Sequence, residues 1–344
     1  MPPLLVSLIT SQLRGKKVPF LVRPIGKAID SLAIIATLFG TATSLGLGAQ
    51  QINSGLDFLW GTGVSNGIAL TIIAVLTVAF ILSAVSGVGK GIQYLSNINM
   101  VLAVVLLVFL AVVGPTTFIM NTFPEALGDY LTNLVSMSFR TAAFSDGEWL
   151  KNWTIFYWAW WVSWAPFVGV FIARISRGRT IREFVVCVLL VPSAVTFVWF
   201  TIMGGSALHS ELVGQGGLVE AVRDEGAAIS LFALLDQYPM ASLTCMLAMF
   251  LVAIFFVSGA DAGSVVMGML SERGTTEPTA PVVVIWGVLA GASAAILLVM
   301  GGLQGLQTAS IIAAAPFLLV MAGLCVSFWH ALMDELEDHG IATD

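Results

Sequence analysis

The sequence predicts an all-α, polytopic membrane protein, and three observations support that prediction. Hydrophobic residues make up 58% of the 344 residues and charged residues only 10%, a balance that a water-soluble domain of this length would not show. Eight apolar runs are each about twenty residues or longer, which is the length a helix needs to cross a hydrocarbon core of about 30 Å. These runs do not alternate in polarity, as the strands of a membrane barrel would.

The eight runs are expected to form one transmembrane domain over residues 1–344. They lie at residues 29–51, 66–86, 98–120, 153–175, 183–204, 238–260, 281–301 and 304–331. Residues 121–152, between the third and fourth runs, place apolar side chains at helical spacing among charged ones. This pattern predicts an amphipathic helix on the outer membrane surface or against a neighbouring subunit. The acidic tail at 332–344 is expected to be cytoplasmic.

The distribution of basic residues predicts the orientation of these helices. With a cytoplasmic N-terminus, eleven of the fourteen lysines and arginines fall in inside segments and three in outside segments. The sequence therefore predicts a multi-pass protein of the cell (inner) membrane with a cytoplasmic C-terminus. It shows no basic patch for nucleic acid, and it shows no nucleophile and base arrangement or paired carboxylates of the kind an enzyme uses.

Tryptophan is concentrated in one segment of the chain. Five of the ten tryptophans lie between Trp153 and Trp164. Tyr157, Trp160, Trp161 and Trp164 follow the i, i+3, i+4, i+7 pattern and so share one helical face. Because the face of an indole attracts a quaternary ammonium group, these rings are candidates for a cage around a ligand cation. The alternative is that they pack in the bundle or anchor the helix at the headgroups.

The first run carries a stripe of small and polar residues at one face. Thr37, Thr41, Ser44 and Gly48 recur at i, i+4, i+7 and i+11. Small residues at this spacing let two helices approach closely, which is the simpler interpretation. Hydroxyl oxygens one turn apart could also bind an alkali cation together with backbone carbonyls from a neighbour. The stripe by itself leaves both interpretations open.

A carboxylate stands just at the inner end of the sixth run. Asp261 follows Ser258, Gly259 and Ala260 in an otherwise apolar helix. An acid at such a position needs water, an ion or a polar partner, so Asp261 is either a functional residue or an interface residue at the cytoplasmic rim.

The segment WTIFYWAWWVSWAPFVGVFIARISRGRTIRE at 153–183 resembles the signature of the betaine/choline/carnitine transporter family. ATLFGTATSLGLGAQQI at 36–52 and FFVSGADAGSVVMGML at 255–270 extend the resemblance. It implies a leucine-transporter-like fold, in which two inverted five-helix repeats enclose a site at the membrane midplane. On that basis 29–120 would be the last three helices of the first repeat and 153–331 the complete second repeat. The family's first four helices would be absent.

The resemblance also implies roles for individual residues. Trp161 would belong to the substrate cage, Trp160 and Trp164 would line the cytoplasmic path, and Phe156 would lie nearby, beside Tyr157. No cofactor is expected, and sodium, as the coupling ion, would bind at two sites. The residues implied are Thr37, Thr41 and Phe167 for the first site and Ser258 and Phe255 for the second. Gly259 stands where sodium-coupled members usually carry a second hydroxyl, so the sequence departs from the family there.

The resulting functional prediction is a secondary transporter rather than an enzyme. It would import a small quaternary ammonium solute of the glycine betaine, choline or carnitine type by sodium symport, in the lipid bilayer. The resemblance implies a homo-oligomer, specifically a trimer. Three alternatives remain open: a truncated fragment that does not transport, a sodium-independent exchanger, and a membrane receptor or channel subunit that uses the cage only to bind.

Overall fold

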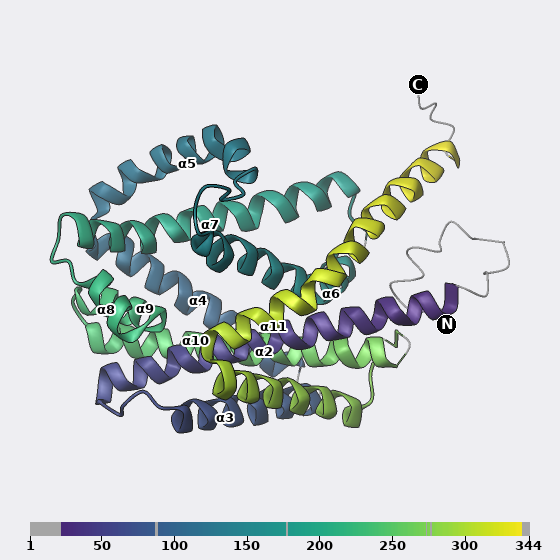
Figure 1. The fold of residues 1–344 in the computed structure, drawn as a ribbon, viewed down its shortest axis with the longest axis horizontal. Coiled ribbons are helices and arrows are strands. Elements are labelled where there is room, and N and C mark those ends of the chain that lie inside the picture. The colour runs from purple at the N-terminus through teal and green to yellow at the C-terminus, as the bar shows by residue number, and fades with distance from the viewer. Residues whose placement is uncertain (1–21, 87–88, 177, 273, 276, 339–344) are drawn as a thin grey trace.

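The computed structural model describes residues 22–338 apart from 87–88, 177, 273 and 276. Residues 1–21 of the expected domain and 339–344 of the expected tail lie outside the described residues. The regular secondary structure of the described part consists of helices, with no strand (Figure 1). The elements in chain order are α2 (Val22–Trp60), α3 (Asn66–Ser86), α4 (Gly89–Val113), α5 (Thr116–Ser138), η2 (Leu150–Ile155), α6 (Phe156–Ile175), α7 (Ile181–Leu212), α8 (Leu218–Glu225), η3 (Ala227–Ile229), α9 (Ser230–Asp236), α10 (Ala241–Ser271) and α11 (Ala280–Asp338).

Six stretches of helix in the described part are long and apolar enough to cross a membrane. They are Ile25–Trp60, Asn66–Ser86, Ser96–Val113, Ile181–Leu212, Ala241–Ser271 and Ala280–Met333. This confirms an all-helical protein that passes the membrane several times. Two of the eight predicted runs, 281–301 and 304–331, fall together in α11, and the tryptophan-rich run forms α6, which is not among the six.

The two runs within α11 are separated by a sharp break in the backbone. Gly302 has φ 55° and ψ −146°, a conformation that interrupts the helix and that glycine adopts without the steric cost of a Cβ. Figure 1 accordingly shows α11 as two arms that run in different directions. The sequence boundary predicted between 301 and 304 therefore coincides with a real change of direction.

Helix α2 is the central element of the bundle, in contact with α3, α6, α10 and α11 (Figure 1). Glycine allows this close packing, because a Cβ on Gly48 would collide with the Phe256 ring and one on Gly46 with Leu306. Thr43 adds a hydrogen bond of 3.0 Å from its hydroxyl to the Leu306 carbonyl oxygen. Gly48, a member of the small-residue stripe predicted from the sequence, is thus a packing contact with α10, whereas Gly46 and Thr43 pack against α11 from another face of α2.

The predicted amphipathic segment 121–152 is helical over part of its length. Helix α5 begins earlier, at Thr116, and ends at Ser138, and η2 starts at Leu150 and leads into α6. The intervening chain includes Gly147 at a positive φ of 70°. Helix α5 packs along α7, where the rings of Tyr130 and Phe197 meet edge to face at 5.4 Å between centroids.

Helix α6 is held against α2 at a point where α2 lacks side-chain bulk. A Cβ on Gly40 would collide with the hydroxyl of Ser163 and stand 3.0 Å from the Trp164 ring. Buried apolar contacts continue the junction, with Ala36 and Val162 in a cluster that also holds Phe317 of α11. This close approach brings the tryptophans of α6 to the polar stripe of α2.

Candidate substrate and ion site

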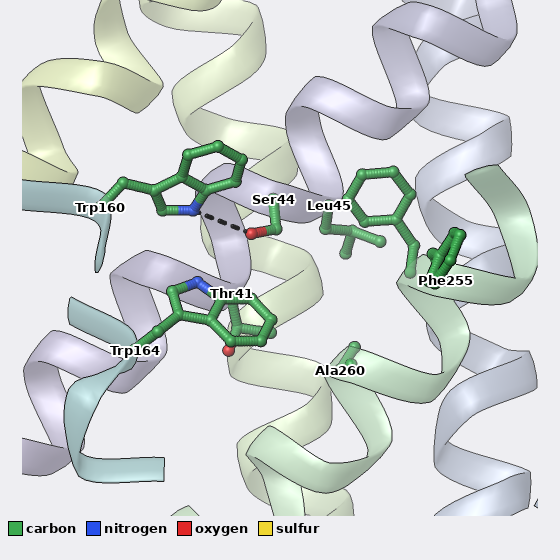
Figure 2. A pocket seen from close by; sticks show the side chains of 9 residues that line it. Thr41, Ser44, Leu45, Trp160, Trp164, Phe255 and Ala260 are labelled. Atoms are coloured by element: carbon green, nitrogen blue, oxygen red, sulfur yellow. Dashed lines mark hydrogen bonds between the residues drawn. The ribbon is translucent and has the colours of Figure 1, made fainter. Parts of the chain in front are cut away.

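A cavity of about 210 Å³ lies where α2, α6 and α10 meet (Figure 2). Each helix contributes one part of its wall: the polar stripe of α2, two indoles of α6, and the small and aromatic residues of α10. The lining residues are Thr41, Ser44, Leu45, Trp160, Trp164, Phe255, Phe256, Gly259 and Ala260. A largely apolar wall with a few placed polar groups is typical of sites for small ligands.

The Trp160 ring is fixed at both its edge and its face. Its Nε1 donates a hydrogen bond of 3.0 Å to the Ser44 hydroxyl, which joins α6 to α2 across the cavity wall (Figure 2). Phe156 stacks on the ring at 5.7 Å between centroids and 13° between planes. The predicted neighbour Phe156 is therefore a buried support for Trp160 and does not line the cavity itself.

The Trp164 ring lines the same cavity, and its N–H differs from that of Trp160. Nε1 of Trp164 is buried and has no hydrogen-bond partner among the described residues. Phe167 contacts the ring edge to face at 5.6 Å. A buried donor without a partner costs about 1–3 kcal/mol.

The remaining predicted cage residues line a second, more open hollow. Trp161 is 71% exposed and Trp158 70% exposed, and both border a hollow of about 480 Å³ together with Trp153, Thr154 and Tyr157. Trp153 and Tyr157 stack there at 5.8 Å with planes 5° apart. The structure therefore does not bring Trp161 and Tyr157 into the cavity of Trp160 and Trp164.

Helical geometry explains this division. Tyr157 and Trp161 are one turn apart, as are Trp160 and Trp164, and the two pairs form neighbouring stripes about 60° apart around the helix. The stripe of Trp160 and Trp164 faces α2, and the other stripe turns away from it. The expectation of a single cavity shared by all four rings is corrected by this arrangement.

The residues implied for the first sodium site lie along α2 and α6. Thr41 lines the cavity, and its Oγ1 would stand 3.0 Å from a Cβ on Gly263 of α10. Thr37, one turn before it, is buried and donates a hydrogen bond of 2.8 Å to the Ala33 carbonyl. Phe167 is partly buried and packs in the cluster around Ala33. Thr41 is therefore a lining residue of the cavity and Thr37 is not.

The residues implied for the second sodium site lie one turn apart on α10. Phe255 lines the cavity, whereas the Ser258 hydroxyl donates a hydrogen bond of 3.1 Å back to the Phe255 carbonyl. Gly259 borders the cavity without a side chain, and a Cβ at this position would stand 3.2 Å from the Trp164 ring. Within the described residues no three His, Cys, Asp or Glu side chains gather as a metal site.

Two contacts at this site could not be found from local sequence patterns. Ser44 was part of the polar stripe, yet its bond to Trp160 joins residues 116 positions apart. Asp261 stood out as a buried acid, and its partner is Ser83 of α3, which donates at 2.9 Å across 178 positions. The only sequence signal for either pair is a polar residue within an apolar helix.

The fold and the cavity define a class of protein: a multi-pass helical membrane protein with an aromatic-walled site between its helices. A family model described as "BCCT, betaine/carnitine/choline family transporter" matches residues 2–337. The chain belongs to this family, which consists of transporters and not enzymes.

Several curated relatives carry specific transporter names. The chain is 47% identical over 335 residues to the glycine betaine transporter OpuD of Bacillus subtilis, covering 97% of this chain and 64% of the relative. It is 44% identical to a probable glycine betaine transporter of Desulfitobacterium hafniense, covering 97% and 66%. A glycine betaine/proline/choline transporter of Vibrio parahaemolyticus is 41% identical, with 90% and 56% covered. The chain thus spans between half and two thirds of the length of these relatives.

Proposed function

We propose that this chain serves a secondary transporter that imports a small quaternary ammonium solute, and that the cavity between α2, α6 and α10 lies on the substrate path. The observation that supports this most is the pair of indoles, Trp160 and Trp164, on one wall of a cavity otherwise lined by apolar and small residues. An indole face attracts a quaternary ammonium by about 0.5–2 kcal/mol, depending on how far the site is desolvated. A protonated amine would lose hydrogen bonds to water in such a site, whereas a trimethylammonium group has none to lose.

The proposed substrate is a zwitterion of the glycine betaine type. Its cation suits the indole faces, and its carboxylate can accept a hydrogen bond from the buried Nε1 of Trp164, which has no partner in the described part of the chain. The relatives named as glycine betaine transporters support this order of preference. Carnitine also carries a carboxylate, while choline offers only a hydroxyl as acceptor, so we place choline last.

The outer hollow is proposed as a second position for the cation on the same path. Tyr157 and Trp161 lie on α6 beside the cavity stripe, and their exposed rings can receive a quaternary ammonium before or after it reaches Trp160 and Trp164. The resemblance to the family assigns Trp161 to the substrate cage. In this account the solute moves along α6 from one aromatic pair to the other.

Sodium is proposed as the coupling ion. Thr37, Thr41 and Phe167 are proposed for one site, of which Thr41 already lines the cavity. Ser258 and Phe255 are proposed for a second, weaker site, because Gly259 supplies no hydroxyl. A sodium-independent exchanger is the alternative, and the missing hydroxyl at Gly259 is the specific observation that favours it.

The proposed setting follows the family resemblance. Residues 29–120 would contribute three helices to one repeat and 153–331 would form the inverted second repeat, which gives eight membrane helices with α6 and both arms of α11 counted. The protein would lie in the cell inner membrane as a homo-oligomer, a trimer by resemblance, with its C-terminus in the cytoplasm.

Uptake of labelled glycine betaine by cells that lack other betaine carriers tests this function. Residues 1–344 are expressed, and accumulation is measured in sodium and in potassium medium, with the Trp160→Ala/Trp164→Ala double variant as control. Accumulation that requires sodium and is lost in the double variant supports the symporter. Accumulation that is equal in potassium supports the exchanger, and saturable binding without accumulation means that this chain recognises the solute but does not carry it.

A further inference from the structure

We infer that Ser44 is a positioning residue that holds the Trp160 indole in the orientation the cavity needs. The inference rests on the proposed function for the identity of the ligand. It goes beyond that function because it assigns a role to a residue of α2 that is not itself an expected ligand of the cation.

The direction of the hydrogen bonds at Ser44 supports this role. A serine hydroxyl has one proton, and here the Ser44 hydroxyl lies 3.0 Å from the Gly40 carbonyl oxygen, which can only accept. Toward Trp160 the Ser44 oxygen is therefore left as an acceptor, and an indole Nε1 is a donor only. The two bonds are mutually consistent, so the oxygen is oriented by the backbone of α2 before it meets the ring.

The ring is restrained from two directions that belong to different helices. Phe156 of α6 covers it at 5.7 Å and nearly parallel, and Tyr157 meets it edge on at 5.9 Å. These contacts come from the same helix as Trp160 and move with it. The bond to Ser44 comes from another helix, so it ties the ring to α2 and through α2 to the Thr41 side of the cavity.

Trp164 provides an internal contrast. It lines the same cavity from the next turn of α6, but its Nε1 has no partner in the described part of the chain. The Trp160 indole is thus tethered to α2 by a hydrogen bond that the Trp164 indole does not match. We assign Trp160 as the fixed wall of the cation site, with Ser44 setting the plane of its ring.

The first test is a double-mutant cycle on the full chain, with binding of labelled glycine betaine as the readout. Ser44→Ala is expected to raise the Kd about fivefold, and Ser44→Thr, which keeps the hydroxyl, to restore it to within about twofold. Ser264→Ala is the matched control, because Ser264 is buried in α10 and its hydroxyl bonds to the Ala260 carbonyl of its own helix. In a Trp160→Phe background, where the N–H is absent, Ser44→Ala is expected to change the Kd by less than twofold.

Two results of the cycle would overturn the inference. One is an effect of Ser44→Ala no larger than that of Ser264→Ala. The other is the same fold-change in the Trp160→Phe background, since Ser44 would then act through something other than the indole. Melting temperatures of all variants separate a loss of fold from a loss of ring position.

A second readout needs no ligand and distinguishes failure of this inference from failure of the proposed function. The protein is labelled with ¹⁵N-tryptophan, and the Trp160 indole N–H resonance is identified by its absence in Trp160→Phe. Ser44→Ala is expected to shift this resonance and speed its exchange with solvent, while Ser264→Ala leaves it in place. An unmoved resonance in Ser44→Ala rejects the positioning role, whereas a shifted resonance in a protein that binds no betaine retains the role and rejects only the substrate.

Discussion

The Ser83 hydroxyl of α3 donates a hydrogen bond of 2.9 Å to Oδ2 of Asp261 on α10. Asp261 is 6% exposed and lies in a helix that is long and apolar enough to cross the membrane. It directly follows Gly259 and Ala260, which line the cavity. The bond therefore ties the wall of the cavity to α3, and a buried acid in this position depends on its polar partner.

Loss of the Ser83 hydroxyl should destabilise the protein. In Ser83→Ala the Asp261 carboxyl loses this donor in a buried setting, and we expect a loss of about 1–3 kcal/mol. Ser86→Ala is the control, since the exposed Ser86 hydroxyl bonds to the Ser83 carbonyl within its own helix. Thermal unfolding in detergent micelles measures both. Equal melting temperatures for the two variants would show that the bond between α3 and α10 contributes nothing.

Gly48 should not tolerate a side chain. A Cβ at Gly48 would collide with the Phe256 ring, and forcing it in should cost about 1–3 kcal/mol. Phe256→Leu in the same chain should recover part of that loss by making room. The control is Gly128→Ala on α5, where no atom lies within 4 Å of the new Cβ and the exchange should be neutral or stabilising by about 0.5–1 kcal/mol. If Gly48→Ala has the same melting temperature as the unsubstituted protein, the proposed close packing of Gly48 against Phe256 is wrong.

Trp164→Phe should separate ligand affinity from stability. The change removes a buried N–H that has no partner among the described residues. The melting temperature should therefore equal or exceed that of the unsubstituted protein. Affinity for glycine betaine should fall by about 1 kcal/mol, because the ligand loses a donor. Trp286→Phe is the contrast: its Nε1 donates at 2.8 Å to Ser271, so its loss should lower stability and leave affinity unchanged. An unchanged betaine Kd in Trp164→Phe would reject the proposed carboxylate contact.

Thr41→Ala should weaken the dependence on sodium. Thr41 is buried and lines the cavity, so its hydroxyl is the one best placed to contact an ion there. We expect the sodium concentration for half-maximal betaine binding to rise severalfold and Thr41→Ser to restore it, since serine keeps the oxygen ligand. Thr71→Ala on the exposed face of α3 is the control. Binding that is equal in sodium and potassium for the unsubstituted chain would remove sodium from the account.

Glu272 should contribute stability in a defined pH range. It lies just beyond α10, where hydrogen bonds from the Thr279 hydroxyl at 2.5 Å and backbone N–H at 2.9 Å lower the pKa of its carboxyl below the ordinary 4.5. A lowered pKa means that the contribution is complete above about pH 4.5 and is lost as the pH falls through the folded value. The difference in melting temperature between the unsubstituted protein and Glu272→Gln should therefore shrink below about pH 4.5. If this difference in melting temperature grows as the pH is lowered, the pKa of Glu272 is not lowered by folding.

Apolar run lengths were sufficient to predict an all-helical membrane protein, because burial in lipid requires every backbone group to be satisfied within its own helix. They also placed a boundary between residues 301 and 304, and the structure breaks α11 at Gly302. Glycine at that point offered the only local signal. The predicted third run, 98–120, was wrong in its end, because α4 stops at Val113 and α5 begins at Thr116. Gly114 and Pro115 between them are a local break signal that run length alone does not register.

The candidate site was predicted in its residue types and only partly in its grouping. Helical periodicity placed Tyr157, Trp160, Trp161 and Trp164 on one face, but it contains no information about where α2 would pack. The position of α2 divides that face into an inner pair and an outer pair. The bond between Ser44 and Trp160 could not be predicted from periodicity either. It joins residues 116 positions apart and depends on the close packing of α6 on α2 at Gly40.

The central claim is that the indoles of α6 recognise a quaternary ammonium cation. The most direct test is competition for labelled glycine betaine bound to the purified chain, using 3,3-dimethylbutyrate, which has the same shape and carboxylate but a neutral carbon in place of the charged nitrogen. Because an uncharged group gains nothing from the indole quadrupole, we predict that unlabelled glycine betaine competes and 3,3-dimethylbutyrate does not at concentrations about tenfold higher. Equal competition by the two compounds would contradict the account.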